Sequence, residues 1–200
     1  MQEKAEGPES TRNQQFRSAG QSPKTTSVDI TSPNFKRILV AYDGMQLSKR
    51  ALGYAAYLSQ ISNSEIVVIN IVKASLDSND LLPITMNMNL DRKEEQIKVA
   101  AASREGFQLS DNLRTVIKEM KGACGASGME GVIVFEIRKG DPADEIIEFS
   151  NLMRPDLIIM GSRQIASRIG GIGSTTRKVA TTSRIPLLIV QKQPRYKDEW

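Results

Sequence analysis

The chain has 200 residues, of which 40% are hydrophobic and 25% charged, a composition typical of one globular domain with a buried core. Its formal net charge of +4 is mild and its aromatic content is only 5%, so the basic excess is interpreted as a solvated surface and nucleic acid is not expected as a partner. The chain has no histidine, which excludes a Ser-His-Asp triad, a histidine-bearing zinc site and a histidine general base.

Cysteine content and hydropathy bear on the cellular compartment in which we expect the protein. The single cysteine, Cys124, cannot form an intramolecular disulfide, which fits a reducing environment. No stretch approaches the roughly 20 apolar residues of a membrane span, and the N-terminus lacks an apolar signal core. We therefore expect a cytoplasmic protein without a membrane partner, in which Cys124 has no catalytic role.

The first 33 residues are predicted to be a disordered, solvated arm. They are rich in Ser, Thr, Gln, Glu and Pro, and their four basic and four acidic residues cancel, so the net charge lies on the rest of the chain. Residues 34–193 are predicted to form the one domain, followed by a short tail at residues 194–200.

Five short apolar runs are predicted to be buried strands. In chain order they are residues 37–42, 65–72, 132–137, 156–160 and 186–190. Pro186, which lacks a backbone donor, suits the start of the last strand or an edge position.

Helical patterns lie between most of these strands. Residues 73–90 are instead expected to form a long loop, and it stays open whether Met86 and Met88 close over a ligand or pack on the core. The first predicted helix spans residues 47–58. The second spans residues 91–123, with an interruption near Gly106, and ends at the glycines 122, 125, 128 and 131. The third spans residues 142–152 with Asp141 as N-cap, and the fourth runs from a capping Ser174 to Ser183.

Alternation of apolar strands with helices predicts an α/β fold: a doubly wound, five-stranded parallel sheet with helices on both faces. In such a sheet, ligands bind at the carboxyl ends of the strands, where the strand order reverses.

Two segments are predicted to lie at those ends. Asp43, directly after the first strand, suits a hydrogen bond from an adenine amino group or a ribose hydroxyl, but its spacing alone favours a helix N-cap. The glycine-rich stretch Gly161–Thr175 suits a phosphate, because glycines allow close backbone approach and the following helix presents free N–H donors, with Arg163 and Arg168 adding positive charge. The alternative is an ordinary loop whose glycines serve tight turns. Neither a Walker-type Gly-Lys-Ser/Thr sequence nor a G-x-G-x-x-G after the first strand is present.

These segments resemble universal stress protein domains over roughly residues 35 to 192. The resemblance is carried by KRILVAYDG at Lys36–Gly44, KGDP at Lys139–Pro142, PDLIIMGSR at Pro155–Arg163 and SRIPLLIV at Ser183–Val190. It implies an adenine nucleotide α hydrolase-like fold, dimers, and in many members ATP binding.

The resemblance also implies a binding site. ATP-binding members carry Gly-x2-Gly-x9-Gly-Ser/Thr. Gly161 and Gly173-Ser174 match this pattern, but Gln164 replaces the second glycine and the spacer is one residue shorter. Asp43 would face adenine, and Ser174 and Thr175 would hold phosphate. The full set of implied binding residues is Ala41, Tyr42, Asp43, Ile71, Met160, Gly161, Arg163, Gln164, Gly170, Gly171, Gly173, Ser174 and Thr175.

Three functions follow from this. The first is a dimeric stress-response or signalling module that binds ATP or AMP, with or without Mg²⁺. The second is a member that has lost nucleotide binding through Gln164 and the short loop, and acts as a protein-interaction module. The third is an ATPase or nucleotidyl-transferring enzyme, with a weak ATPase activity at most, for which no base beyond Asp43 is visible and which would need Mg²⁺.

The last strand, from Pro186 to Val190, is the predicted homodimer edge. The resemblance favours pairing of two such strands, whereas a charged neighbour such as Lys192 would favour a protected edge.

Overall fold

The computed structural model describes residues 35–72, 83–91, 110–162 and 171–192. All of them belong to the unit of residues 34–200, which is distinct from residues 1–33. The predictions for the tails at residues 1–33 and 194–200 therefore lie outside the described residues.

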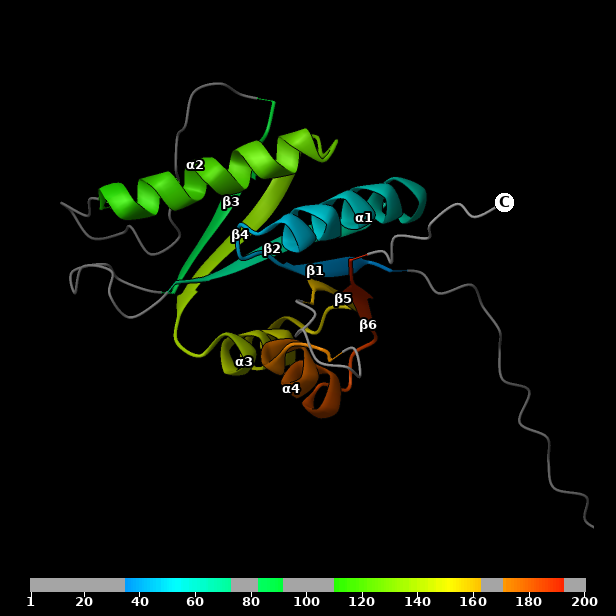
Figure 1. The fold of residues 1–200 in the computed structure, drawn as a ribbon. Coiled ribbons are helices and arrows are strands. Elements are labelled where there is room, and N and C mark those ends of the chain that lie inside the picture. The colour runs from blue at the N-terminus through cyan, green and yellow to red at the C-terminus, as the bar shows by residue number, and fades with distance from the viewer. Residues whose placement is uncertain (1–34, 73–82, 92–109, 163–170, 193–200) are drawn as a thin grey trace, which may run out of the picture. The chain divides into compact units, whose positions relative to one another are not determined.

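Six strands form one sheet in the order β3-β4-β2-β1-β5-β6 (Figure 1). Five of them run parallel and correspond to the five predicted strands, whereas β3 pairs with β4 in the antiparallel sense. The doubly wound parallel sheet is thus confirmed, with one further strand at its edge. The strands are β1 (Arg37–Ala41), β2 (Glu65–Val72), β3 (Ile84–Asn89), β4 (Val132–Lys139), β5 (Leu157–Gly161) and β6 (Leu187–Val190).

Helices cover both faces of the sheet, α1 and α2 on one face and α3 and α4 on the other (Figure 1). Successive residues of a strand point to opposite faces, so Val40 joins the core under α1 and α2 while Leu39 joins the core under α3 and α4. Burial on both faces explains the continuous apolar runs. In the described part of the chain, no helix is both long and apolar enough to cross a membrane. The helices are α1 (Gln46–Ser62), α2 (Asp111–Ala126), α3 (Pro142–Met153) and α4 (Ser174–Thr182).

The long loop expected at residues 73–90 is wrong in its last part, where β3 lies. Residues 73–82 are outside the described residues, but Ile84–Asn89 forms a strand along β4, with Met88 opposite Ile133. Its sequence, ITMNMN, alternates apolar and polar residues, which is the pattern of a strand with one buried face. Met86 and Met88 are buried in the core, so they pack on it rather than close over a ligand.

The prediction for the second helix is corrected at its C-terminal end. Residues 92–109 lie outside the described residues, and α2 begins at Asp111, after Ser110, whose hydroxyl accepts a hydrogen bond from the Leu113 amide at 3.3 Å. The helix continues to Ala126, so the glycines at 122 and 125 lie inside it. Glycine weakens a helix interior by about 1 kcal/mol relative to alanine without preventing the helix.

The predicted start of α3 is confirmed. The Asp141 carboxylate accepts hydrogen bonds from the amides of Ala143 and Asp144, both at 3.1 Å, and Pro142 is the first helical residue. Proline suits this position because its missing N–H would have had no partner in the helix.

A buried arginine ties α3 to the sheet. The Arg138 guanidinium, on β4, donates to Glu145 at 2.6 Å and Glu148 at 2.8 Å on α3 and to Glu136 at 3.3 Å, and lies 5.6 Å from the Phe149 ring centre. Burial raises the pKa of the Glu136 carboxyl. The hydrogen bond from Thr85 and the positive charge of Arg138 lower this pKa, but the effect of burial is larger. Removing one partner of such a pair leaves an uncompensated buried charge, so the group fixes α3 on the sheet.

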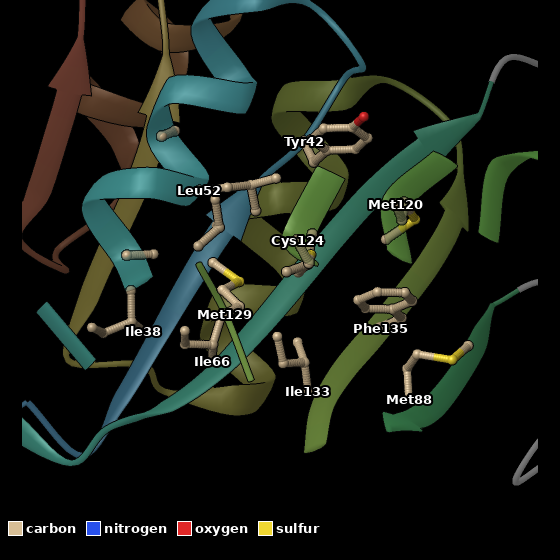
Figure 2. Close-up of a cluster of buried hydrophobic side chains, with 14 of the residues drawn as sticks. Ile38, Tyr42, Leu52, Ile66, Met88, Met120, Cys124, Met129, Ile133 and Phe135 are labelled. Atoms are coloured by element: carbon tan, nitrogen blue, oxygen red, sulfur yellow. The ribbon is translucent and has the colours of Figure 1, made fainter. Parts of the chain in front are cut away.

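Cys124 lies in the core between α2 and the sheet, among the side chains of Figure 2. It is fully buried, and burial raises the pKa of its thiol to about 12. The thiolate is the reactive form of cysteine, so this environment gives an inert thiol and agrees with the interpretation of Cys124 as a bystander.

We predict that the Cys124 thiol of the native protein does not react with Ellman's reagent at pH 8, and reacts fully in denaturant. The reason is that both thiolate formation and access require opening of the core. Thr115→Cys in a Cys124→Ala background moves the thiol to the exposed surface of α2 and provides the matched control, which should react at once. Rapid labelling of native Cys124 would show that this core is not closed.

Candidate functional site

A pocket of about 640 Å³ lies at the carboxyl ends of β1, β2 and β5. β1 and β5 are neighbours, and α1 leaves β1 toward one face of the sheet while α4 follows β5 on the other. The pocket is therefore at the reversal of strand order where doubly wound sheets bind their ligands. It is lined by Ala41, Tyr42, Asp43, Met45, Gln46, Leu47, Ser48, Ile71, Pro142, Ile146, Met160, Gly161, Gly173, Ser174, Thr175 and Thr176.

Most of the predicted binding residues meet here. Those that line the pocket are Ala41, Tyr42, Asp43, Ile71, Met160, Gly161, Gly173, Ser174 and Thr175. Gly171 is described, but it is not one of the lining residues. Arg163, Gln164 and Gly170 lie outside the described residues, so the altered part of the glycine pattern has no structural account here.

The end of β1 is held by hydrogen bonds to β2. The Tyr42 amide donates to the Ile69 carbonyl at 2.9 Å, and the Asn70 side chain donates to the Tyr42 carbonyl at 2.8 Å. These bonds extend the order of the sheet one residue past β1 and place Asp43 at the mouth of the pocket.

Asp43 shapes the turn into α1, but it is not the helix cap that its spacing favours. Met45 occupies the N-cap position, and no side chain caps the helix. The Asp43 carboxylate accepts a hydrogen bond from the Met45 amide at 3.0 Å, and the buried Ser48 hydroxyl donates to the Met45 carbonyl at 2.9 Å. The exposed carboxylate is thereby oriented at the pocket mouth.

The start of α4 is tied to the end of β5. The Gly173 amide donates to the buried hydroxyl of Ser162 at 3.1 Å, and the Thr176 hydroxyl donates to the Gly161 carbonyl at 3.4 Å. The prediction of Ser174 as the cap is wrong: Gly173 is the N-cap, and Ser174 is the first helical residue. The first turn of α4 is fixed beside the pocket by these two contacts.

The four helices of the described residues differ in how their N-termini are capped. Ser110 and Asp141 accept hydrogen bonds at the starts of α2 and α3, whereas α1 and α4 have no side-chain cap. Pro142, at the capped start of α3, lines the pocket, and so do the first turns of the two uncapped helices, α1 and α4. Both present N–H donors and the positive end of a helix dipole, a combination that accepts an anion.

The rest of the lining is largely apolar. Ala41 lies in β1, Ile71 in the neighbouring strand β2 and Met160 in β5. Pro142 and Ile146 belong to α3. Asp43 is the one charged side chain among the lining residues. The pocket thus combines an apolar wall, one carboxylate and two groups of backbone donors, a common composition of small-molecule sites.

Several lining residues were not predicted from the sequence. They are the N-cap Met45 and the first-turn residues Gln46, Leu47 and Ser48 of α1, Pro142 and Ile146 of α3, and Thr176 of α4. The turn after Asp43 was available as a signal, because a helix that follows a strand begins at the same sheet edge. Ile146 carried no such signal, since only the packing of α3 brings it to the pocket. Within the described ranges, no group of three or more Cys, Asp or Glu side chains is arranged to hold a metal ion.

Gly161 is required by packing. A Cβ at this position would lie 2.8 Å from the Leu47 carbonyl carbon and 2.9 Å from the Ser48 amide nitrogen. Such distances are shorter than real Cβ contacts, and the opposing atoms belong to backbone that cannot move independently. The glycine therefore allows the first turn of α1 to lie against the end of β5.

Comparison with known proteins shows that this chain is similar to universal stress proteins in sequence and in fold. The model of the universal stress protein family matches residues 34–191. The stress response protein NhaX of Bacillus subtilis is 30% identical over 168 residues, covering 78% of this chain and 97% of NhaX. The universal stress protein YxiE of the same organism is 25% identical over 161 residues, covering 78% of this chain and 99% of YxiE. The crystal structure of a universal stress protein in complex with cAMP has the same fold, with a TM-score of 0.51 and 18% identity over 79% of this chain and 98% of that one.

We predict that Gly161→Ala lowers the free energy of unfolding by about 1–3 kcal/mol, because the added methyl group forces α1 away from β5. Gly53→Ala is the matched control: Gly53 lies inside α1 with nothing within 4 Å of the added Cβ, so this variant should gain up to about 1 kcal/mol. Urea unfolding followed by circular dichroism measures both. Equal stabilities for the two variants would mean that the contact between α1 and β5 is looser than described.

Proposed function

Because the chain belongs to the universal stress protein family, we propose that it binds an adenine nucleotide in the pocket between β1, β5 and the first turns of α1 and α4. One observation carries the proposal: α1 and α4, the described helices without side-chain caps, both begin at this pocket. Free amide donors converge there on a space with an apolar wall, and a nucleotide has both an anionic and a flat apolar part.

The lining suggests an orientation for the ligand. Adenine would lie against Ala41 and Ile71, with the Asp43 carboxylate accepting a hydrogen bond from its amino group or from a ribose hydroxyl. The phosphates would lie at Ser174 and Thr175, in the first turn of α4, which has no side-chain cap among the described residues. That a universal stress protein of the same fold has been crystallised with cAMP supports the choice of an adenine nucleotide.

ATP or AMP is the proposed ligand, with Mg²⁺ accompanying the longer phosphate chain. Asp43 is the one carboxylate among the lining residues, and it accepts the Met45 amide in the turn. The proposal therefore includes no more than a weak ATPase activity and centres on binding as a stress-response or signalling function.

We further propose that the chain forms a homodimer through its last strand. β6 is an edge strand of the described sheet, and Leu187, Leu188 and Ile189 are half-buried in the single chain. Pairing with a second copy would cover these side chains and the unpaired backbone groups of the edge.

A second candidate function rests on Gln164, which replaces a glycine of the ATP-binding pattern. In that case the chain is a dimeric interaction module whose phosphate loop has degenerated. A charge-assisted hydrogen bond lost from the loop costs about 1.5–3 kcal/mol, which corresponds to roughly 10- to 100-fold in affinity.

We predict that Ser174→Asp weakens ATP binding at least about tenfold, weakens AMP binding less, and leaves adenosine binding unchanged. The new carboxylate repels phosphate at the start of α4, where an acidic residue is favourable for the helix itself, so the fold is retained. Isothermal titration of nucleotide-free protein measures the three affinities. Thr115→Asp, on the exposed surface of α2, is the control for added charge and should bind like the parent.

The proposal fails if the folded parent protein shows no saturable binding of any adenine nucleotide at millimolar concentration. Equal loss of ATP and adenosine binding in Ser174→Asp would instead show that the phosphates do not lie at α4.

We predict that Gln164→Gly strengthens ATP binding by roughly 10-fold or more, because glycine restores the backbone approach that the family pattern uses. The same titration measures this variant. Binding that appears only in Gln164→Gly would identify the parent as the degenerate interaction module, whereas unchanged affinity would show that the loop re-forms without this glycine.

A further inference from the structure

A second cavity, of about 610 Å³, lies on the other side of the β1 end, between α1 and the C-terminal half of α2. Only Tyr42 and Gln46 line both this cavity and the nucleotide pocket. The remaining lining comes from the turn at Gly44, from α1 and from α2. The cavity is therefore a separate space, and the proposed nucleotide site does not account for it.

Tyr42 places a polar group in this cavity. The residue is only 5% exposed, and its ring belongs to the core under α1 and α2. Figure 2 shows its hydroxyl oxygen at the outer end of that cluster, directed away from the other labelled side chains. No hydroxyl hydrogen bond of Tyr42 is found within the described ranges. Among the described residues, no fully buried side-chain nitrogen or oxygen lacks a hydrogen-bond partner, so the Tyr42 hydroxyl is open to solvent and available to a ligand.

The Tyr42 hydroxyl is held in its donor form. Burial, and next to it the carboxylate of Glu119, raise the pKa of Tyr42 above its ordinary value. A tyrosine hydroxyl is already protonated near neutral pH, and the upward shift leaves it a donor from which a hydroxyl or phosphate oxygen in the cavity can accept a hydrogen bond.

Charges line two sides of the cavity. Lys49 and Arg50 come from α1, and Glu119 comes from the facing helix α2. In the part of the chain that the structure describes, none of these three side chains forms an ion pair. A molecule with an anionic group at one end and hydroxyl groups at the other would satisfy both sides, because carboxylates accept hydrogen bonds from hydroxyls and cations bind anions.

The wall on α2 is formed by small residues. Gly122 and Ala123 leave room beside the charged groups, and a Cβ added at Gly122 would have nothing within 4 Å. The Ser127 hydroxyl donates to the Ala123 carbonyl at 2.8 Å, which leaves its oxygen free to accept a hydrogen bond. A compact ring would fit against this wall.

From these observations we propose that the second cavity binds a small phosphorylated sugar or polyol. Lys49 and Arg50 bind its phosphate, Glu119 and Tyr42 bind its hydroxyl groups, and the wall at Gly122 contacts its carbon skeleton. The sugar phosphate is either a free metabolite or part of a nucleotide that reaches across Tyr42 and Gln46 from the neighbouring pocket. The proposal goes beyond nucleotide binding and stands without it.

The probe is ribose 5-phosphate, titrated into the ¹⁵N-labelled full chain and followed by two-dimensional NMR. The expected result is a saturable shift of the amide signals of Gly44, Gly122 and Ser127. The double variant Lys49→Gln, Arg50→Gln should weaken this binding at least about tenfold.

A pair of α2 variants separates occupancy of the cavity from effects on the helix. Gly122→Leu fills the cavity and should abolish ribose 5-phosphate binding. Gly125→Leu is the matched control, since Gly125 lies in the same helix, also has nothing within 4 Å of its added Cβ, and does not line the cavity. It should bind like the parent.

A second titration in the presence of ATP distinguishes the sources. If ribose 5-phosphate still shifts Gly122 and Ser127, the ligand is a free sugar phosphate. If ATP alone shifts these signals and displaces ribose 5-phosphate, the sugar phosphate belongs to a nucleotide that spans both pockets. The proposal is overturned if the shifts are absent up to about 10 mM, are confined to Gly173–Thr175, or persist unchanged in the double variant.

Discussion

The contact between Gly161 and the first turn of α1 is the constraint on which the site depends. β1 and β5 lie side by side, and the chain leaves them toward opposite faces of the sheet, so the first turn of α1 must pass beside the end of β5. A side chain at position 161 would collide with the backbone of Leu47 and Ser48. With glycine there, the starts of α1 and α4 line one pocket, and Ser162 and Thr176 hold α4 in place.

The backbone hydrogen-bond donors of the pocket come from two helix N-termini that have no side-chain cap. At the starts of α2 and α3, the side chains of Ser110 and Asp141 accept hydrogen bonds from helix amides. At Met45 and Gly173 no side chain does so, and the donors are left for a ligand. This asymmetry supports the proposed phosphate site in a chain without a Walker motif or a histidine, and it fits a binding function better than a demanding reaction.

Much of the fold follows from local patterns, whereas the site follows only in part. Apolar runs identify β1, β2, β4, β5 and β6 because burial on both faces requires them. β3 was missed because Pro83 and the asparagines of ITMNMN indicated a loop, although the alternation of its apolar residues was the stronger signal. Asp43 and Ser174 were placed at the right edge but given the wrong capping roles, since hydrogen bonds in a turn depend on backbone geometry. Ile146 and the buried Arg138 group depend on how α3 packs, which no local pattern reports.

Identification of the small molecules that the purified full chain releases on denaturation, by mass spectrometry, tests the central claim most directly. The account predicts an adenine nucleotide, ATP or AMP, at close to about one per chain, because one pocket with two free helix N-termini serves each chain. A folded protein that releases no adenine compound, and takes up none when incubated with millimolar ATP or AMP, would contradict it.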